Sequence, residues 1–121
     1  MWYFAYGSNL SRRKMLKTIA GRWREECVGT ARGFEVVFNK RSTLWGAAAN
    51  LAAAPRKTCH GVLYKTTPTF VALPKSITDS PKPSDEYLKI IVEGGREHGL
   101  PQSYLQELVR KAKKVERRDV R

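Results

Sequence analysis

The feature that most constrains this chain is its first stretch, where a short apolar strand stops at a glycine and a helix start follows at once. Residues 2–6 are aromatic or apolar and suit a buried strand. Gly7 frees the backbone for a sharp turn, and Ser8, Asn9 or Ser11 can each cap the following helix. Such a junction gathers unpaired backbone N–H groups and the positive end of a helix dipole, so it can hold a carboxylate, a phosphate or a developing oxyanion. A capped turn without a ligand is the alternative on this pattern alone.

The spacing of apolar residues predicts one short helix after the turn and two longer helices near the other end. We expect the short helix over residues 11–20. The longer helices are expected over residues 84–99, with Ser84 as the N-cap, and over residues 101–113. Residues 114–121 are basic and are expected to fray.

Period-two alternation predicts strands between the helices. We expect them near residues 26–29 and over residues 34–38, 58–64 and 69–73. The alanine-rich residues 45–55 have a composition that favours a helix on propensity alone.

The length of 121 residues fits a single domain, which we place over residues 1–113, with residues 114–121 as a basic tail. Cys27 and Cys59 stand far apart and outside any Cys/His ligand pattern. We therefore expect two buried, reduced thiols, with neither a disulfide nor a metal site. The chain shows no signal segment and no run of about 18 apolar residues, which predicts a cytoplasmic protein without a membrane partner.

The charge of the chain is strongly positive, with 23 Lys and Arg against 11 Asp and Glu and a formal net charge of +12. This balance favours anionic partners and leaves a basic nucleic-acid-associated protein as one alternative. No RNP, zinc-finger, KH or dinucleotide-binding signature accompanies the basic residues. We interpret them as a solvated surface and expect any binding of nucleic acid to be weak and independent of sequence.

Three blocks, in order, resemble the γ-glutamylcyclotransferase-like family, which includes AIG2-like proteins and γ-glutamylamine cyclotransferases. They are residues 3–10 (Tyr-Phe-Ala-Tyr-Gly-Ser-Asn-Leu), residues 61–64 (Gly-Val-Leu-Tyr), and a helical part at residues 82–88 and 97–104. The resemblance implies an α+β fold, a compact and mostly antiparallel β-barrel of about five or six strands with flanking helices. It also implies that the alanine-rich residues 46–54 form a barrel strand, against their helical propensity.

The resemblance implies a reaction as well. In this family the α-amine of a γ-glutamyl compound attacks its own γ-carbonyl, which releases an amine or amino acid and closes 5-oxoproline. The family's substrate-binding positions correspond here to Tyr6, Gly7, Ser8, Asn9, Leu10 and Tyr87. The resemblance implies no metal or organic cofactor. It implies that the protein's partner is a small γ-glutamyl compound or carboxylate.

The chain departs from the family at the catalytic base. The relatives carry a general-base glutamate in a Leu-Asp-x-x-Glu-Gly-like segment between the second and third blocks. Here the interval between Tyr64 and Pro83 contains Asp79 but no glutamate, so the catalytic residues stay unassigned. Either the chain is a shortened relative, which would make it a catalytically silent binder of small carboxylates, or its 121 residues omit an internal stretch. Whether the protein is an enzyme is therefore left open.

Overall fold

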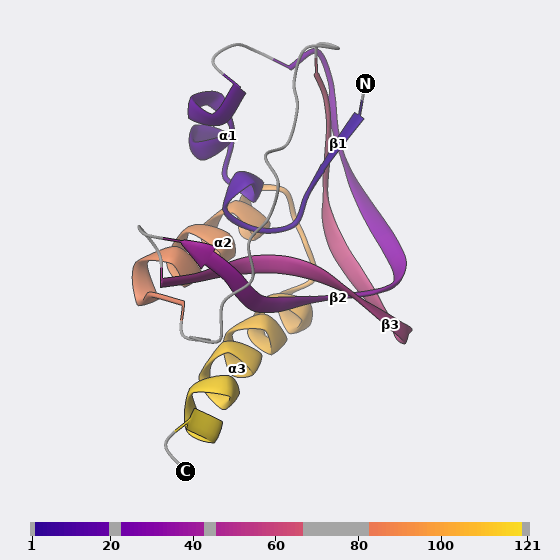
Figure 1. Cartoon of the computed structure of the whole chain (residues 1–121). Helices are drawn as coiled ribbons and strands as arrows, with labels where there is room; N and C mark the ends of the chain where they lie inside the picture. Colours follow the sequence, from indigo (N-terminus) through magenta and orange to yellow (C-terminus); the bar gives the residue numbers. More distant parts are fainter. Residues whose placement is uncertain (1, 20–22, 43–45, 67–82, 120–121) are drawn as a thin grey trace.

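The computed structural model describes residues 2–19, 23–42, 46–66 and 83–119 (Figure 1). In chain order its elements are β1 (Trp2–Ala5), a 3-10 turn η1 (Ser8–Leu10), α1 (Arg12–Ile19), β2 (Glu26–Ser42), β3 (Gly46–Lys65), α2 (Asp85–Glu97) and α3 (Gln102–Asp119). The predicted strand over residues 69–73 lies outside the described residues, as does Asp79. The mixture of helices with an antiparallel sheet confirms the α+β class.

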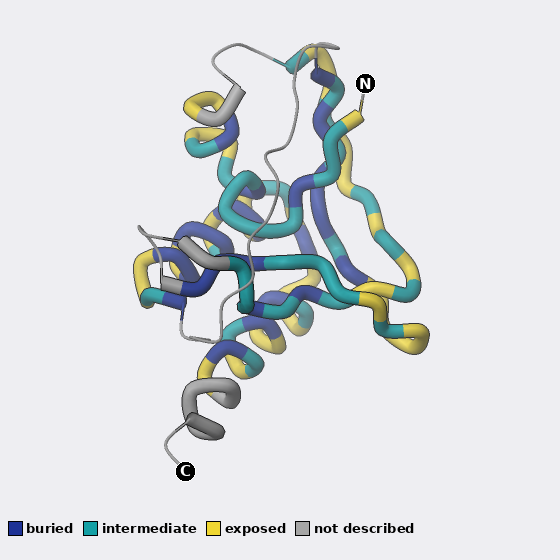
Figure 2. Tube along the Cα trace, in the orientation of Figure 1, coloured by how far each residue is buried: buried dark blue, intermediate teal, exposed yellow. Residues whose placement is uncertain are grey.

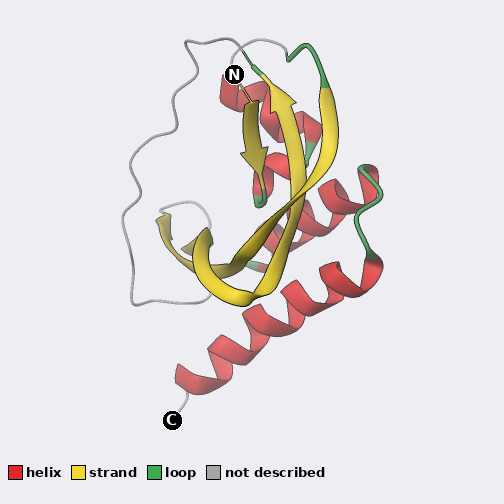
Figure 3. Ribbon diagram, turned by 90° about the vertical axis from the view of Figure 1, so that its right-hand side faces the viewer, coloured by secondary structure: helices red, strands yellow, loops and turns green. Residues whose placement is uncertain are grey.

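The sheet has three antiparallel strands in the order β1-β3-β2. The short β1 pairs with the end of β3, and β2 pairs with β3 along most of its length. Figure 3 shows the two long strands curling together as in a barrel, with α2 and α3 behind them. Within the described residues no pairing between β1 and β2 closes the sheet.

The two long strands each combine segments that the sequence predicts as separate strands. Residues 26–29 and 34–38 are parts of β2, and the alanine-rich residues 46–54 are the first part of β3. The register of β2 shifts around Gly33, whose φ of +83° is a left-handed conformation that glycine adopts readily. The family resemblance implies five or six strands, whereas the described residues form three. The number is smaller because the chain bends and continues as one strand where the sequence predicts that a strand ends. The prediction of a strand over residues 46–54 is confirmed.

The helices also follow local signals. The Ser84 side chain accepts a hydrogen bond from the backbone N–H of Tyr87 at 3.1 Å, so it caps α2 as predicted. Gly99, with φ of +74°, ends that segment. The backbone of α3 is helical as far as Asp119, past the position where the sequence predicts the tail to begin. In the described part of the chain, no helix is both long and apolar enough to span a membrane.

The core lies where the helices and the turn meet the sheet, as the dark blue segments in Figure 2 show. Its largest fully buried side chains come from the turn, the two long strands and the three helices: Leu10, Met15, Val36, Cys59, Val62, Tyr64, Ile91 and Leu105. Cys59 is buried as expected, but Cys27 is exposed, which corrects the prediction for that residue. The reason is that β2 is an edge strand of the described sheet and its first part is largely exposed.

The backbone of α2 touches the end of the N-terminal turn at Gly94. A Cβ atom on Gly94 would lie 2.4 Å from the backbone nitrogen of Ser11 and 2.6 Å from the carbonyl carbon of Leu10. Side chains do not approach backbone this closely, so the contact requires glycine. Tyr87, Ile91 and Gly94 have the i, i+4, i+7 spacing of one helix face, and the same contact therefore directs Tyr87 toward the turn.

Replacing Gly94 with alanine should lower the free energy of unfolding by about 1–3 kcal/mol, because backbone atoms would have to move to admit the methyl group. This loss should appear even though alanine is the better helix former by about 1 kcal/mol. Urea unfolding followed by circular dichroism measures the difference. The control is Glu93→Ala, at an exposed position of the same helix, which should change stability by less than about 0.5 kcal/mol. Equal stability of the two variants would contradict the contact.

Candidate functional site

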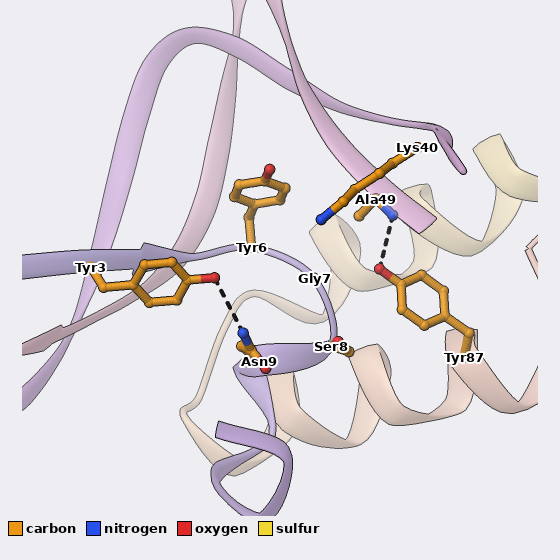
Figure 4. Close-up of a pocket in the computed structure, with 8 residues that line it drawn as sticks. All are labelled: Tyr3, Tyr6, Gly7, Ser8, Asn9, Lys40, Ala49 and Tyr87. Carbon is orange, nitrogen blue, oxygen red and sulfur yellow. Dashed lines mark hydrogen bonds between the residues drawn. The ribbon is translucent and has the colours of Figure 1, made fainter. Parts of the chain in front are cut away.

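A small pocket of about 80 Å³ lies beside the N-terminal turn (Figure 4). Its lining combines β1, the turn, both long strands and α2, and consists of Tyr3, Tyr6, Gly7, Ser8, Asn9, Lys40, Ala49 and Tyr87. Most of these residues carry a hydroxyl, amide or ammonium group. The pocket is therefore suited to a small polar ligand.

Tyr87 joins α2 to both the turn and β3. Its hydroxyl accepts a hydrogen bond from the backbone N–H of Ala49 at 2.8 Å. A Cβ atom on Gly7 would lie 3.1 Å from the same hydroxyl. The side chain is almost completely buried, with 3% of the residue exposed. The hydroxyl is thus held at a fixed point between the strand and the turn.

Burial keeps Tyr6 and Tyr87 neutral. It raises the pKa of Tyr87 to about 12, even though hydrogen bonds from the backbone of Ala49 and Ser8 act to lower that pKa. Burial also raises the pKa of Tyr6, with a smaller contribution from Cys59. Both phenols therefore keep their protons near neutral pH, where they can form hydrogen bonds but do not act as bases.

The turn itself is a single 3-10 turn. The backbone N–H of Leu10 donates to the carbonyl of Gly7 at 3.0 Å, and that of Ser11 donates to the carbonyl of Ser8 at 3.1 Å. Gly7 has φ of −120° and ψ of −133°, so the sharp turn does not use a left-handed conformation. Space is also limited at this residue, because a Cβ atom there would lie 3.1 Å from Cβ of Ala49.

The three candidate caps have different roles. The Ser11 hydroxyl accepts a hydrogen bond from the backbone N–H of Lys14 at 3.4 Å and so caps α1. The Asn9 amide donates to the hydroxyl of Tyr3 at 3.2 Å, which orients it beside the pocket. Ser8 is the first residue of the turn, whose N-cap position is occupied by Gly7.

Five of the six substrate-binding residues expected from the sequence line the pocket: Tyr6, Gly7, Ser8, Asn9 and Tyr87. Leu10 does not, because its side chain is fully buried in the core and its N–H is used within the turn. Tyr3, Lys40 and Ala49 also line the pocket and were not predicted from the sequence. Tyr3 lies in the same sequence block as the turn, residues 3–10. No local pattern marks Lys40 or Ala49 as pocket residues.

A second polar cluster holds the end of the turn. The Tyr64 hydroxyl donates to the carbonyl of Leu10 at 3.3 Å and lies 3.2 Å from Nε2 of His98. Nδ1 of His98 lies 3.6 Å from Oε1 of Glu26, and Nε of Arg12 donates to the same oxygen at 2.8 Å. This chain of contacts joins β2, β3 and both neighbouring helices to the turn. Its members were not identified from the sequence because they are far apart in the chain.

The environment of His98 disfavours its charged form. Only 4% of its side chain is exposed. Burial, followed by the charge of Arg12, lowers the pKa of His98, whereas the carboxylates of Glu26 and Glu97 act in the opposite direction. The histidine is therefore neutral at pH 7, and protonating it would place a second positive charge beside Arg12.

The described lining of the pocket contains no Asp or Glu. Glu26 and Glu97 lie near the end of the turn, but both interact with Arg12 there and neither lines the pocket. Among the described residues, no group of three His, Cys, Asp or Glu side chains could hold a metal ion. The pocket thus offers hydrogen-bond donors and one ammonium group, without an assigned carboxylate base.

Comparison with known sequences points to one family. The sequence model of the AIG2-like family matches residues 43–108, more than half of the chain. The match includes β3, α2 and the beginning of α3, and it leaves out the N-terminal turn. No curated protein matches the chain in sequence.

Solved structures share the fold at low sequence identity. A protein named gamma-glutamyl cyclotransferase has a TM-score of 0.72 and 23% identity, over 89% of this chain and 85% of its own. The uncharacterized human protein loc79017 has a TM-score of 0.72 and 22% identity, over 88% and 85%. YkqA from Bacillus subtilis has a TM-score of 0.69 and 17% identity, over 93% of this chain but 54% of its own. At these identities the likeness shows a common fold.

Acid should destabilise the protein through His98. Because the pKa of His98 is lowered from its ordinary value of 6.5, the unfolded chain takes up the proton first. The contribution of His98 to the free energy of unfolding is complete above about pH 6.5. It is lost as the pH falls through the lowered pKa of His98 in the folded protein. Urea unfolding between pH 8 and 5 measures this loss. The pKa of Glu26 is also lowered, mainly by Arg12 against the effect of burial, so its loss comes at more acidic pH.

The variant for this prediction is His98→Asn, which removes the imidazole from the polar cluster at the end of the turn. His98→Asn should flatten the pH dependence of stability between pH 7 and 5. A parallel loss of stability in the wild type and His98→Asn would show that this histidine is not responsible.

Proposed function

The chain belongs to the AIG2-like family, and from that membership we propose that its turn pocket binds γ-glutamyl compounds, the substrates of a cyclisation that forms 5-oxoproline. The observation that carries the proposal is the meeting of the turn and Tyr87 in one polar pocket. These are the positions to which the family resemblance assigns substrate binding. The fold shared with a protein named gamma-glutamyl cyclotransferase supports the same reaction class.

Cyclisation sets three tasks for the protein. It must fold the γ-glutamyl chain so that amine and carbonyl meet, hold the negative oxygen of the tetrahedral intermediate, and remove a proton from the ammonium group. A pocket of about 80 Å³ is small enough to favour a folded ligand. The first two tasks match groups in the described lining.

The turn and Tyr87 divide these binding roles. The N–H groups of Leu10 and Ser11 are used inside the turn, and that of Ser8 donates to the Tyr87 hydroxyl, so carboxylate binding falls to the backbone N–H groups of Gly7 and Asn9 and to the Asn9 amide. The Tyr87 hydroxyl accepts its hydrogen bond from Ala49 and retains its own proton, since its pKa is about 12. That proton can be donated to the developing oxyanion when the substrate is bound.

Proton removal has no such match in the described lining, and this favours a second candidate function, a catalytically silent binder of small carboxylates. A positioned carboxylate typically supplies about 10²–10⁴-fold in rate. Glu86 adjoins Tyr87 in sequence, but it is exposed, and successive helical residues point about 100° apart. Neither Tyr6 nor Tyr87 can replace the carboxylate, because burial raises the pKa of each.

A protein of these 121 residues, with its mass verified as 13.8 kDa, should bind γ-glutamyl compounds weakly and release no 5-oxoproline. A version with the family's glutamate-bearing segment inserted between Tyr64 and Pro83 should release it. The assay measures 5-oxoproline formed from γ-glutamyl amino acids, γ-glutamyl amines and glutathione. Rapid turnover by the 121-residue protein that survives both Asp79→Asn and Glu86→Gln would refute this account of the missing base.

Gly7→Val should abolish binding of 5-oxoproline or glutamate, measured by calorimetry. The added side chain would begin 3.1 Å from both the Tyr87 hydroxyl and Ala49, and would fill the small pocket. Tyr87→Phe, which keeps the ring but removes the hydroxyl, should weaken binding by about tenfold. Circular dichroism checks that both variants fold. Undiminished binding by folded Gly7→Val would place the ligand elsewhere.

A further inference from the structure

Lys40 is the one charged side chain among the described residues that line the pocket. It comes from β2, and its ammonium group points toward Tyr6 and Gly7 in Figure 4. Ser8 and Asn9 lie on the other side of the pocket in the same view. The lining therefore presents a positive charge across the pocket from Ser8 and Asn9.

A bulge in β2 accounts for the position of Lys40. The register shifts between Phe38 and Lys40, where two steps along β2 correspond to one step along β3, so Asn39 is the extra residue. The Asn39 side chain accepts a hydrogen bond from the Asn50 amide at 3.0 Å, which ties the bulge to the neighbouring strand. With strict alternation, Lys40 would share the core-facing side of buried Phe38. Bulges change the direction of neighbouring side chains, and Lys40, which directly follows the bulge, lines the pocket.

The charge of the pocket distinguishes two classes of γ-glutamyl compound. The γ-glutamyl group carries an ammonium and a carboxylate, which balance. A γ-glutamyl amino acid has a second carboxylate on its leaving group and is an anion near neutral pH, whereas a γ-glutamyl alkylamine is neutral overall. A partly buried lysine attracts a carboxylate more strongly than an exposed one, because solvent screens the interaction less. The net charge of +12 favours the anion in addition.

We propose that Lys40 binds the carboxylate of the leaving group, so that the pocket selects γ-glutamyl amino acids over γ-glutamyl amines. This inference rests on the proposed function and names the substrate class of the same site. The turn holds the γ-glutamyl carboxylate, and Lys40 holds the second carboxylate from β2. An ammonium group on a flexible stem can follow the differing positions that this second carboxylate takes in different amino acids.

The test compares γ-glutamyl-alanine with γ-glutamyl-ethylamide, which differ only in the carboxylate of the leaving group. Calorimetry on the full chain should show about tenfold tighter binding of γ-glutamyl-alanine, the gain of one charge-assisted hydrogen bond. Lys40→Met keeps the apolar stem but removes the charge, and should reduce this preference to about one, mainly by weakening the binding of γ-glutamyl-alanine. Lys40→Arg should retain the preference, which separates loss of charge from loss of folding.

The matched control is Lys89→Met, which removes one exposed lysine on α2 away from the pocket and should keep the preference of the wild type. Equal affinity of the wild type for both ligands, or a preference that survives Lys40→Met, overturns the inference and leaves the proposed function standing. Equal weakening of both ligands in Lys40→Met would place the lysine at the shared γ-glutamyl carboxylate, which also overturns it. Absence of binding for both ligands in the wild type would instead overturn the proposed function, and the inference with it.

Discussion

The contact between Gly94 and the end of the N-terminal turn is the constraint on which the rest of the structure depends. Only a residue without Cβ allows the backbone of α2 to lie against Leu10 and Ser11. Tyr87 lies two turns earlier on the same helix face, so this contact also determines where its hydroxyl meets Gly7. One backbone approach thus assembles the core and the pocket together.

The polar groups around the turn are separated by charge. Glu26 receives hydrogen bonds from Arg12 and from Trp23 and faces His98, so its negative charge is used to hold the turn in place. The described pocket lining has neutral hydroxyls, amides and the Lys40 ammonium group instead. This separation suits the binding of anions, because no negative charge in that lining opposes the ligand. It also explains why the glutamates nearest the turn do not supply a base.

Local sequence signals predicted the parts of the fold that depend on neighbouring residues. Ser84 caps α2 because its hydroxyl reaches a backbone N–H three residues away, and Gly99 ends that segment because glycine accepts a positive φ. The alanine-rich segment is different, since its own propensity favours a helix. It forms part of β3 because pairing with β2 outweighs that propensity, and only the family resemblance anticipated this.

The sequence by itself determined the strand-to-helix turn, its glycine and the helix that carries Tyr87, because each follows from contacts within a few residues of chain. Tertiary structure alone decided that Leu10 faces the core, that Cys27 is exposed, and that Lys40 enters the pocket. These outcomes depend on helix packing, on which strand forms the edge of the sheet, and on a one-residue bulge in the register of β2. Such features arise between residues far apart in the chain, where periodicity and propensity carry no information.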